Sequence, residues 1–151
     1  MCEGEQLTSE ELNTTTMCFN SYMPPTARRW TAHSSISYRC ALSADGTKVL
    51  SASDDGTLRL WDLTADDPNA AAPVVLRGHE DWVRGCALSA DGTKALSASD
   101  DKTLRLWDLT ADDPSAATPV VLRGHEGRVN GCALSADGTK ALSASEDTTL
   151  R

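Results

Sequence analysis

Short runs of alternating apolar and polar residues, separated by turn residues, make up most of the chain after residue 28. Between Thr103 and Trp107, Leu104 and Leu106 fall on one face of an extended chain, and Thr103, Arg105 and Trp107 fall on the other. Such a period of two is the signature of a strand with two different faces. The Asp-Gly and Asp-Asp pairs between the runs favour hairpin turns. The pattern predicts an all-β fold of short antiparallel strands.

The runs recur with a fixed period of 46 residues, which separates Cys40 from Cys86, Cys86 from Cys132 and His79 from His125. A constant period of this size indicates tandem structural repeats. Within one repeat we predict four strands, at residues 73–77, 82–88, 94–98 and 103–107, with the turn Ala90-Asp91-Gly92-Thr93 between the second and third.

The repeats divide the chain into an array and a leading segment. We assign units to residues 29–74, 75–120 and 121–151, the last of them incomplete, joined by the loop sequences TADDPNAAAP and TADDPSAATP. Residues 1–28 are polar and lie outside the repeat. We expect that segment to be largely disordered, with at most a short helix begun by Thr8 and Glu11 at capping-box spacing.

The charge balance narrows the choice of partner. Acidic residues number 22 against 14 basic ones, a formal net charge of -8, and this field repels phosphate backbones and anionic lipids. We therefore expect neither nucleic acid nor a membrane as partner. The acidic beginning MCEGEQLTSEEL does not resemble a secretory signal, and no apolar run is long enough to span a bilayer. An intracellular, cytoplasmic protein is expected.

Five cysteines are present, and Cys40, Cys86 and Cys132 occupy the same position of the repeat. Since they do not form the cluster typical of a disulfide framework, we expect reduced thiols that pack as small apolar residues between units. As metal ligands, His79 with Cys86 would supply two groups where zinc needs four. The acidic loops lack the glycine turn of a calcium site. We expect no metal and no cofactor.

Four dipeptides, Trp61-Asp62, Gly78-His79, Trp107-Asp108 and Gly124-His125, resemble the WD and GH signatures of the WD-repeat β-propeller family. The resemblance covers about residues 29–151, and the first unit departs from it by carrying Ala32-His33. It implies a partial β-propeller of four-stranded antiparallel meanders, with two complete units and a truncated third. The tryptophan of the third unit would fall two residues past Arg151.

The resemblance also implies one structural hydrogen-bond chain in each unit. In such a chain an aspartate fixes an imidazole, the imidazole bonds a serine hydroxyl, and the hydroxyl accepts an indole N–H, so that no buried polar group is left unpaired. The residues implied are His33, Ser53, Asp55 and Trp61, then His79, Ser99, Asp101 and Trp107, then His125, Ser145 and Asp147.

A serine, a histidine and an aspartate together also suggest a hydrolase triad, with Ser99 as the nucleophile. Repetition argues against this alternative, because an active site is usually built once and this set recurs in every unit. We therefore expect no catalytic residues.

The second and third units differ at only five positions over residues 74–105 and 120–151. Because these positions lie in two connections that emerge on one face of a propeller blade, we predict that they form a partner-binding surface on a constant scaffold. Drift after duplication is the alternative explanation. The predicted binding residues are Ser35, Ile36 and Tyr38, then Asp81, Trp82, Arg84, Asp100 and Lys102, then Arg128, Asn130, Glu146 and Thr148, and Asp54, Gly56 and Gly127 complete the three corresponding sets.

The sequence thus favours a non-catalytic scaffold that binds proteins or peptides. Two complete units and part of a third do not close a propeller, which typically has four to eight blades. Two alternatives follow: the chain is a truncated propeller fragment without independent function, or copies of it associate to complete the ring.

Overall fold

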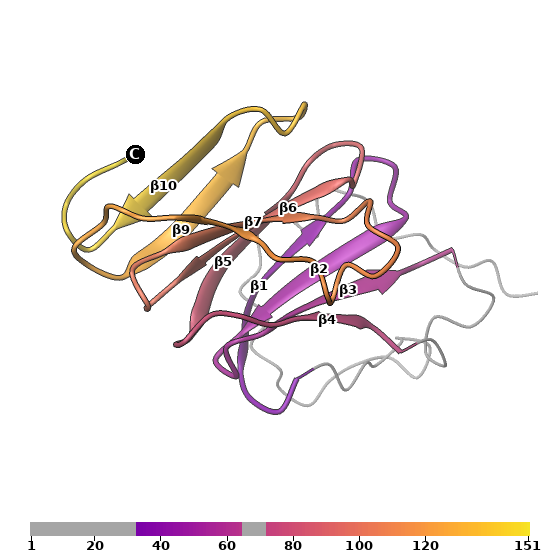
Figure 1. Cartoon of the computed structure of the whole chain (residues 1–151), viewed down its shortest axis with the longest axis horizontal. Coiled ribbons are helices and arrows are strands. Elements are labelled where there is room, and N and C mark those ends of the chain that lie inside the picture. Colours follow the sequence, from indigo (N-terminus) through magenta and orange to yellow (C-terminus); the bar gives the residue numbers. More distant parts are fainter. Residues whose placement is uncertain (1–32, 65–71) are drawn as a thin grey trace, which may run out of the picture.

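The computed structural model describes residues 33–64 and 72–151, which form ten strands and no helix (Figure 1). This confirms the all-β fold class. The first sheet contains β1 (Ser37–Leu42), β2 (Lys48–Ser53), β3 (Leu58–Asp62) and β4 (Val74–Leu76). The second contains β5 (Val83–Leu88), β6 (Lys94–Ser99), β7 (Leu104–Asp108) and β8 (Val120–Leu122). The third contains β9 (Val129–Leu134) and β10 (Ala141–Ser145).

Each four-stranded sheet is an antiparallel meander in chain order, β1-β2-β3-β4 and β5-β6-β7-β8. The third sheet pairs β9 with β10 and is extended by a single bridge between Ala144 and Leu150. Two complete meanders and a smaller third sheet agree with the predicted partial propeller. The expectations for residues 1–28, including Thr8 and Glu11, lie outside the described residues.

The sheets are offset by one strand from the sequence units. The strand predicted to open the second unit is β4, and it pairs with β3 as the last strand of the first sheet, with Leu58 opposite Leu76. The unit boundary between residues 74 and 75 therefore falls inside β4 rather than between sheets. A 46-residue period fixes the spacing of the strands but not the point at which one sheet ends and the next begins, so the sequence left this phase undetermined.

The strand register gives each sheet two chemically different faces. In the first sheet, Ala41, Leu50 and Leu60 stand opposite one another on what we call the forward face, because it contacts the next sheet. Cys40 and Ser51 are partners on the opposite, rear face. The second and third sheets have forward and rear faces at the positions one period later.

The core lies between consecutive sheets. The forward face of the first sheet packs on the rear face of the second, where Leu50 and Leu58 contact a cluster that includes Val83 and Trp107. The forward face of the second sheet contacts Val129 of the third in the same way. Leu50, Leu58 and Val83 are fully buried, and burial of such a side chain stabilises the fold by roughly 1.5 to 3 kcal/mol.

Two of the repeated cysteines lie in these contacts, as expected. The Cys86 thiol donates to the Leu50 carbonyl of the preceding sheet at 3.7 Å, and Cys132 makes the same contact with Leu96. Burial raises the pKa of Cys132 to about 12. Cys40 departs from the expectation because its side chain is exposed on the rear face of the first sheet, where no described strand covers it. All three are free thiols.

The two ends of the sheets differ in how they are connected. At the end that we call the linker end, the turns after β1, β5 and β9 are joined by backbone hydrogen bonds from Ala44 to Ala90 (3.2 Å) and from Ala90 to Ala136 (3.0 Å). Lys48 Nζ also donates to the Gly92 carbonyl of the next sheet at 3.0 Å. These contacts hold neighbouring sheets in a fixed relation through residues that do not vary between repeats.

Candidate functional site

The hydrogen-bond chain of the second sheet runs from the indole of Trp107 to the carboxylate of Asp101. The indole N–H donates to Ser97 Oγ at 3.0 Å, and Ser97 Oγ lies 2.7 Å from His79 Nε2. His79 Nδ1 lies 2.6 Å from Asp101 Oδ2. Because a carboxylate only accepts, Nδ1 carries the imidazole proton and Nε2 accepts from the serine hydroxyl. Every polar atom in this hydrogen-bond chain therefore has a partner.

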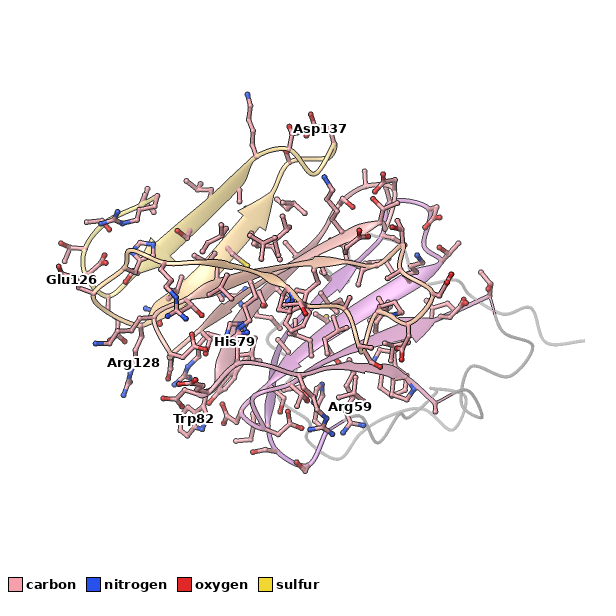
Figure 2. The ribbon with its side chains drawn as sticks, in the orientation of Figure 1. Arg59, His79, Trp82, Glu126, Arg128 and Asp137 are labelled. Carbon is pink, nitrogen blue, oxygen red and sulfur yellow. The ribbon has the colours of Figure 1, made fainter. Side chains whose placement is uncertain are left out.

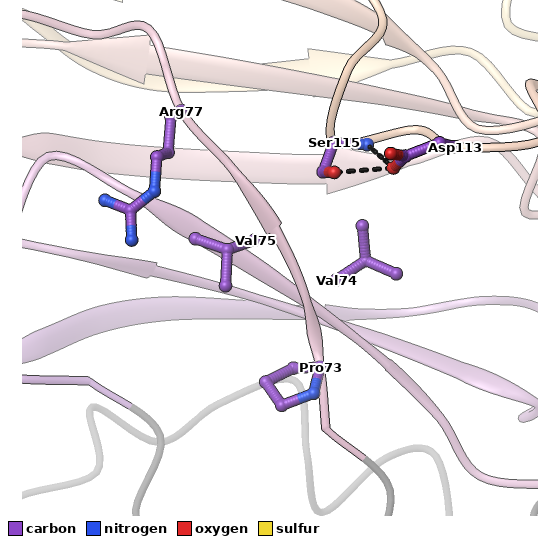
Figure 3. A pocket seen from close by; sticks show the side chains of 6 residues that line it. All are labelled: Pro73, Val74, Val75, Arg77, Asp113 and Ser115. Carbon is purple, nitrogen blue, oxygen red and sulfur yellow. Dashed lines mark hydrogen bonds between the residues drawn. The ribbon is translucent and has the colours of Figure 1, made fainter.

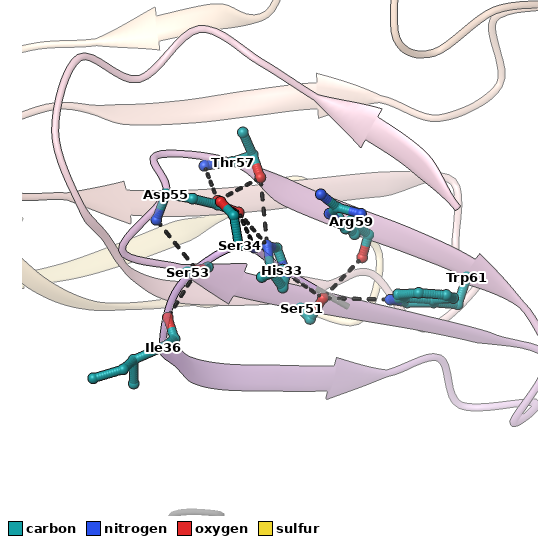
Figure 4. A network of polar contacts seen from close by, with 9 residues as sticks. All are labelled: His33, Ser34, Ile36, Ser51, Ser53, Asp55, Thr57, Arg59 and Trp61. Atoms are coloured by element: carbon teal, nitrogen blue, oxygen red, sulfur yellow. Dashed lines mark hydrogen bonds and ion pairs between the residues drawn. The ribbon is translucent and has the colours of Figure 1, made fainter. Parts of the chain in front are cut away.

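The first sheet repeats this arrangement (Figure 4), with His33 held between Asp55 at 3.1 Å and Ser51 at 2.8 Å, and with Trp61 donating to Ser51 at 3.3 Å. In the third sheet His125 lies 2.7 Å from Asp147. The side chains of His33 and His79 are fully buried and that of His125 is 2% exposed. The three hydrogen-bond chains lie on the rear faces of their sheets.

The serine in each chain is not the one expected. The structure places Ser51, Ser97 and Ser143 beside the imidazoles, two residues before the expected Ser53, Ser99 and Ser145. Residues two apart on a strand share a face, so the alternating pattern cannot distinguish them. The register decides, because Trp61 stands opposite Val49 and its indole therefore reaches Ser51, near the middle of β2.

The expected serines stabilise the following hairpin turns instead. Ser53 Oγ donates to the Ile36 carbonyl at 2.7 Å and accepts the Asp55 amide at 3.2 Å. Ser99 makes the corresponding bonds with the Asp81 carbonyl and the Asp101 amide, at 3.2 and 3.1 Å. A triad nucleophile would have to contact an imidazole. Ser99 bonds the hairpin turn instead.

Burial and hydrogen bonding set the ionisation of His33 and Asp55 in the hydrogen-bond chain of the first sheet. Burial lowers the pKa of His33 below its ordinary value and outweighs the opposing effect of Asp55, so the imidazole is held neutral. Burial also acts to raise the pKa of Asp55, but hydrogen bonds from the Thr57 hydroxyl and amide and from His33 outweigh it and lower the pKa to about 2. A neutral imidazole beside an ionised carboxylate suits a fixed structural bond.

The opposite end of the sheets, which we call the variable end, carries the residues that differ between repeats. Two connections meet there in every sheet through one backbone bond, from Asp54 to Ile36 (3.0 Å), from Asp100 to Trp82 (2.9 Å) and from Glu146 to Arg128 (2.9 Å). Figure 2 shows Trp82 and Arg128 projecting at this end, whereas Asp137 lies at the linker end. The variable positions of the two connections are therefore neighbours.

Arg84 connects two sheets at the variable end. Its guanidinium lies 4.7 Å from the centre of the Trp82 ring and 4.7 Å from that of Tyr38 on the first sheet. Nε and Nη2 donate to the two carboxylate oxygens of Asp100 at 3.1 and 3.0 Å. Cation–π contacts and a bidentate ion pair both orient a guanidinium. Arg84 is therefore fixed in one position while its side chain stays 23% exposed.

The cluster extends to both sides of Arg84. On the first sheet the Tyr38 hydroxyl donates to Asp54 Oδ2 at 3.0 Å, and Asp54 Oδ1 is buried without a hydrogen-bond partner. On the third sheet Arg128 Nε lies 3.7 Å from Asp100 Oδ2, and its side chain is 57% exposed. Contacts of variable residues thus cross all three sheets, a feature that comparison of the repeats alone could not reveal.

The remaining predicted binding residues surround this cluster. Trp82 is 43% exposed and Ile36 is 65% exposed, which leaves two large apolar side chains facing solvent. Among the twelve predicted binding residues, Asp100 is the one that is buried. The other predicted residues that the structure leaves exposed are Ser35, Asp81, Lys102, Asn130, Glu146 and Thr148.

One position of the hairpin turn is left-handed in every sheet. Gly56, Lys102 and Thr148 have φ values of 74°, 68° and 68°. Glycine adopts this conformation freely, whereas another residue there carries a strain of roughly 1 to 3 kcal/mol. The second and third repeats therefore carry side chains at the variable end at a cost in stability.

A shallow hollow at the linker end lies between β4 and the loop that precedes β8 (Figure 3). Its lining includes Val74, Val75 and Asp113, and Asp113 accepts the Ser115 amide and hydroxyl at 2.9 and 2.5 Å. The carboxylate is thus engaged by its own loop. Within residues 33–64 and 72–151, no three acidic, histidine or cysteine side chains gather as a metal site, and no helix could cross a membrane.

A family model described as WD domain, G-beta repeat matches residues 25–62, 73–108 and 118–151. The chain belongs to the WD-repeat family. The second and third matched segments each begin with the last strand of the preceding sheet, β4 or β8, and continue into the following sheet. WD repeats generally mediate protein–protein interaction and are generally not catalytic. A comparison with curated proteins found no match.

Proposed function

We propose that this WD-repeat protein is a non-catalytic scaffold that binds a partner protein through the variable end. The observation that carries the proposal is the position of Arg84, stacked between Trp82 of its own sheet and Tyr38 of the preceding sheet while paired with Asp100. Residues that differ from repeat to repeat thereby form one continuous surface. Aromatic and arginine side chains held in place are the usual anchors of protein interfaces.

The pairing of the variable residues argues against drift. The strand position is Tyr38 in the first sheet and Arg84 in the second, and each donates to the acidic residue of its own hairpin, Asp54 or Asp100. Independent drift would not preserve a donor opposite an acceptor. The change from Tyr to Arg keeps the pair and alters the shape and charge that a partner would contact.

The surface suits a partner that offers both apolar and polar groups. Trp82 and Ile36 present apolar area, and Arg128 presents an exposed cation. An interface centre with a polar rim has this composition. The non-catalytic part of the proposal is supported by Ser97, whose hydroxyl is fully buried between His79 and Trp107 and leaves no space for a substrate.

Affinity purification with quantitative mass spectrometry tests the proposal. The wild-type chain is compared with Trp82→Ala and Arg128→Ala, and with Lys140→Ala as a control that also removes an exposed cation but at the linker end. We expect one set of proteins to fall by about tenfold or more with Trp82→Ala, as for an interface anchor, and to be retained with Lys140→Ala. Retention of every protein by both variable-end variants would contradict the proposal. Labelling of Ser97 by a fluorophosphonate probe would contradict its non-catalytic part.

A further inference from the structure

Trp82 presents an indole that is fixed in place but open to solvent. The Arg84 guanidinium lies 4.7 Å from the centre of this ring and 4.7 Å from that of Tyr38 on the preceding sheet. Arg84 is the bulge residue of β5, where the strand register shifts between Val83 and Gly85, and a bulge re-aims a side chain. Trp82 is still 43% exposed. Because Arg84 covers one face of the indole, the open area is the opposite face and the edge of the ring.

A carboxylate is fixed beside this ring. Asp81 Oδ1 accepts the backbone amide of Trp82 at 2.8 Å. The backbone of both residues is held as well. Ser99 Oγ donates to the Asp81 carbonyl at 3.2 Å, and the Asp100 amide donates to the carbonyl of the tryptophan at 2.9 Å. Asp81 and its neighbour Glu80 are exposed. The indole and the carboxylate therefore form a preorganised pair at the surface.

The carboxylates beside the ring have no counter-charge in the part of the chain that the structure describes. Within residues 33–64 and 72–151, neither Glu80 nor Asp81 takes part in an ion pair. The cation over the ring, Arg84, is neutralised by its bidentate pair with Asp100. Arg128 lies 3.7 Å from the same Asp100 carboxylate. The charge that a partner meets beside the open face of the indole is therefore negative.

The side chain that covers the indole must suit this carboxylate too, because Trp82 and Asp81 are adjacent and lose water together. An apolar side chain would leave the Asp81 carboxylate desolvated without a counter-charge, which is costly. An acidic side chain would be repelled by it. A lysine or arginine side chain gains a cation–π contact with the indole and an ion pair with the carboxylate. Electrostatic and desolvation energies therefore both favour a cation.

We propose that Trp82 and Asp81 bind a lysine or arginine side chain of the partner protein, stacked on the face of the indole opposite Arg84. The indole then lies between two cations, each with its own carboxylate: Arg84 with Asp100, and the partner's cation with Asp81. The inference rests on the proposed function, because it assigns the chemistry that the same surface recognises.

Selection of random heptapeptides by display on the immobilised chain gives the first test. We expect the selected peptides to share a lysine or arginine and to lose about tenfold or more in affinity with Trp82→Ala, as for an interface anchor. Asp81→Asn should weaken their binding by about two- to fivefold, the effect of a partly exposed ion pair. Asp112→Asn is the matched control, because it removes the same charge from an exposed residue in the loop before β8. It should leave the affinity unchanged.

A charge-neutral replacement in the peptide measures the stacking itself. Citrulline has the shape of arginine without its charge, and acetyl-lysine serves the same purpose for lysine. The replacement should weaken binding to the wild-type chain, and the loss should be about two- to fivefold smaller with Trp82→Leu, because leucine keeps an apolar contact but has no π face. An equal loss on both chains would show that the cation does not stack on the indole and would overturn the proposal.

The remaining outcomes separate this inference from the proposed function. Selected peptides that depend on Trp82 but share no cation would overturn the inference and leave the proposed function standing. Peptides that share an acidic residue and are lost with Arg128→Ala would also overturn it and assign an acidic partner. Equal weakening by Asp81→Asn and Asp112→Asn would overturn it, because binding would then report only net charge. If no selected peptide depends on Trp82 or Arg128, the inference and the proposed function both fail.

Discussion

The Arg84 guanidinium lies 4.7 Å from the centre of the Tyr38 ring, although the two residues belong to different sheets. This contact joins the variable positions of the first and second repeats, and a second contact of the same length joins Arg84 to Trp82. The linker end is joined by backbone bonds and by lysine side chains that are the same in every repeat. At the variable end the connection depends on side-chain identity, so each set of variable residues gives a different surface.

A double-mutant cycle measures the energy of this contact. Tyr38→Leu and Arg84→Met, alone and combined, should show a coupling of about 0.5 to 1 kcal/mol in urea unfolding, as for a partly exposed cation–π pair. Tyr38→Phe is the control, because it keeps the ring and removes only the hydroxyl bonded to Asp54. Its coupling with Arg84→Met should be retained. Additive effects of Tyr38→Leu and Arg84→Met would show that the two residues do not interact.

Removal of the serine hydroxyl in the second hydrogen-bond chain should destabilise the fold. Ser97→Ala leaves the buried Trp107 indole N–H and one His79 nitrogen without partners, at a cost of roughly 1 to 3 kcal/mol. The Trp107 indole resonance in a nitrogen–proton correlation spectrum should shift with Ser97→Ala, because its acceptor is lost. With Ser99→Ala the same resonance should stay in place, since Ser99 bonds the hairpin turn. The reverse result would restore the serine that the sequence favoured.

The strand pattern and the 46-residue period were sufficient to predict the all-β fold and the strands, and the resemblance to the WD-repeat family implied the repeated pairing of His79 with Asp101. They could not choose between Ser97 and Ser99, because an alternating pattern treats residues two apart as equivalent. They also could not assign β4 to the first sheet, since a repeat can be divided at any point of its period. Both answers depend on strand register, which is set by packing in three dimensions.

The contacts at the variable end could not be predicted from the sequence either. Comparison of the repeats identified Trp82, Arg84 and Asp100 as positions that change, but gave no reason for the ion pair between Arg84 and Asp100 or for the stacking on Tyr38. The ion pair forms between β5 and the following hairpin of the same sheet, whereas the stacking arises because neighbouring sheets bring residues 46 positions apart close together. The stacking of Arg84 on Tyr38 is therefore a property of the assembled array and not of one repeat.

The left-handed turn position offers a test of strain at the variable end. Thr148→Gly should stabilise the chain by about 1 kcal/mol, because the β-branched side chain is strained at a φ of 68° and glycine is not. Lys102→Gly should stabilise by a similar or smaller amount. The reverse substitution Gly56→Thr should destabilise, since Gly56 has a φ of 74°. Equal melting temperatures for Thr148→Gly and wild type would show that the turn carries no strain.

The ionisation of the first hydrogen-bond chain predicts how stability depends on pH. The pKa of His33 is lowered by burial, so the unfolded chain binds a proton near pH 6.5 that the folded chain resists. His33 therefore stabilises the fold fully above that pH, and its contribution falls as the pH decreases toward the folded pKa. Asp55, with a folded pKa of about 2, stabilises above its unfolded pKa of roughly 3.9 and loses this effect as the pH falls toward 2.

Urea unfolding between pH 7 and pH 3 should thus show a free energy of unfolding that declines first below about pH 6.5 and again below about pH 4. His33→Gln should reduce the first decline, because glutamine does not titrate, and should leave the second decline in place. Asp55→Asn should reduce the second. A His33 pKa above 6.5, measured from imidazole proton shifts in the folded chain, would reverse the sign of the first effect and contradict the neutral, buried imidazole on which it depends.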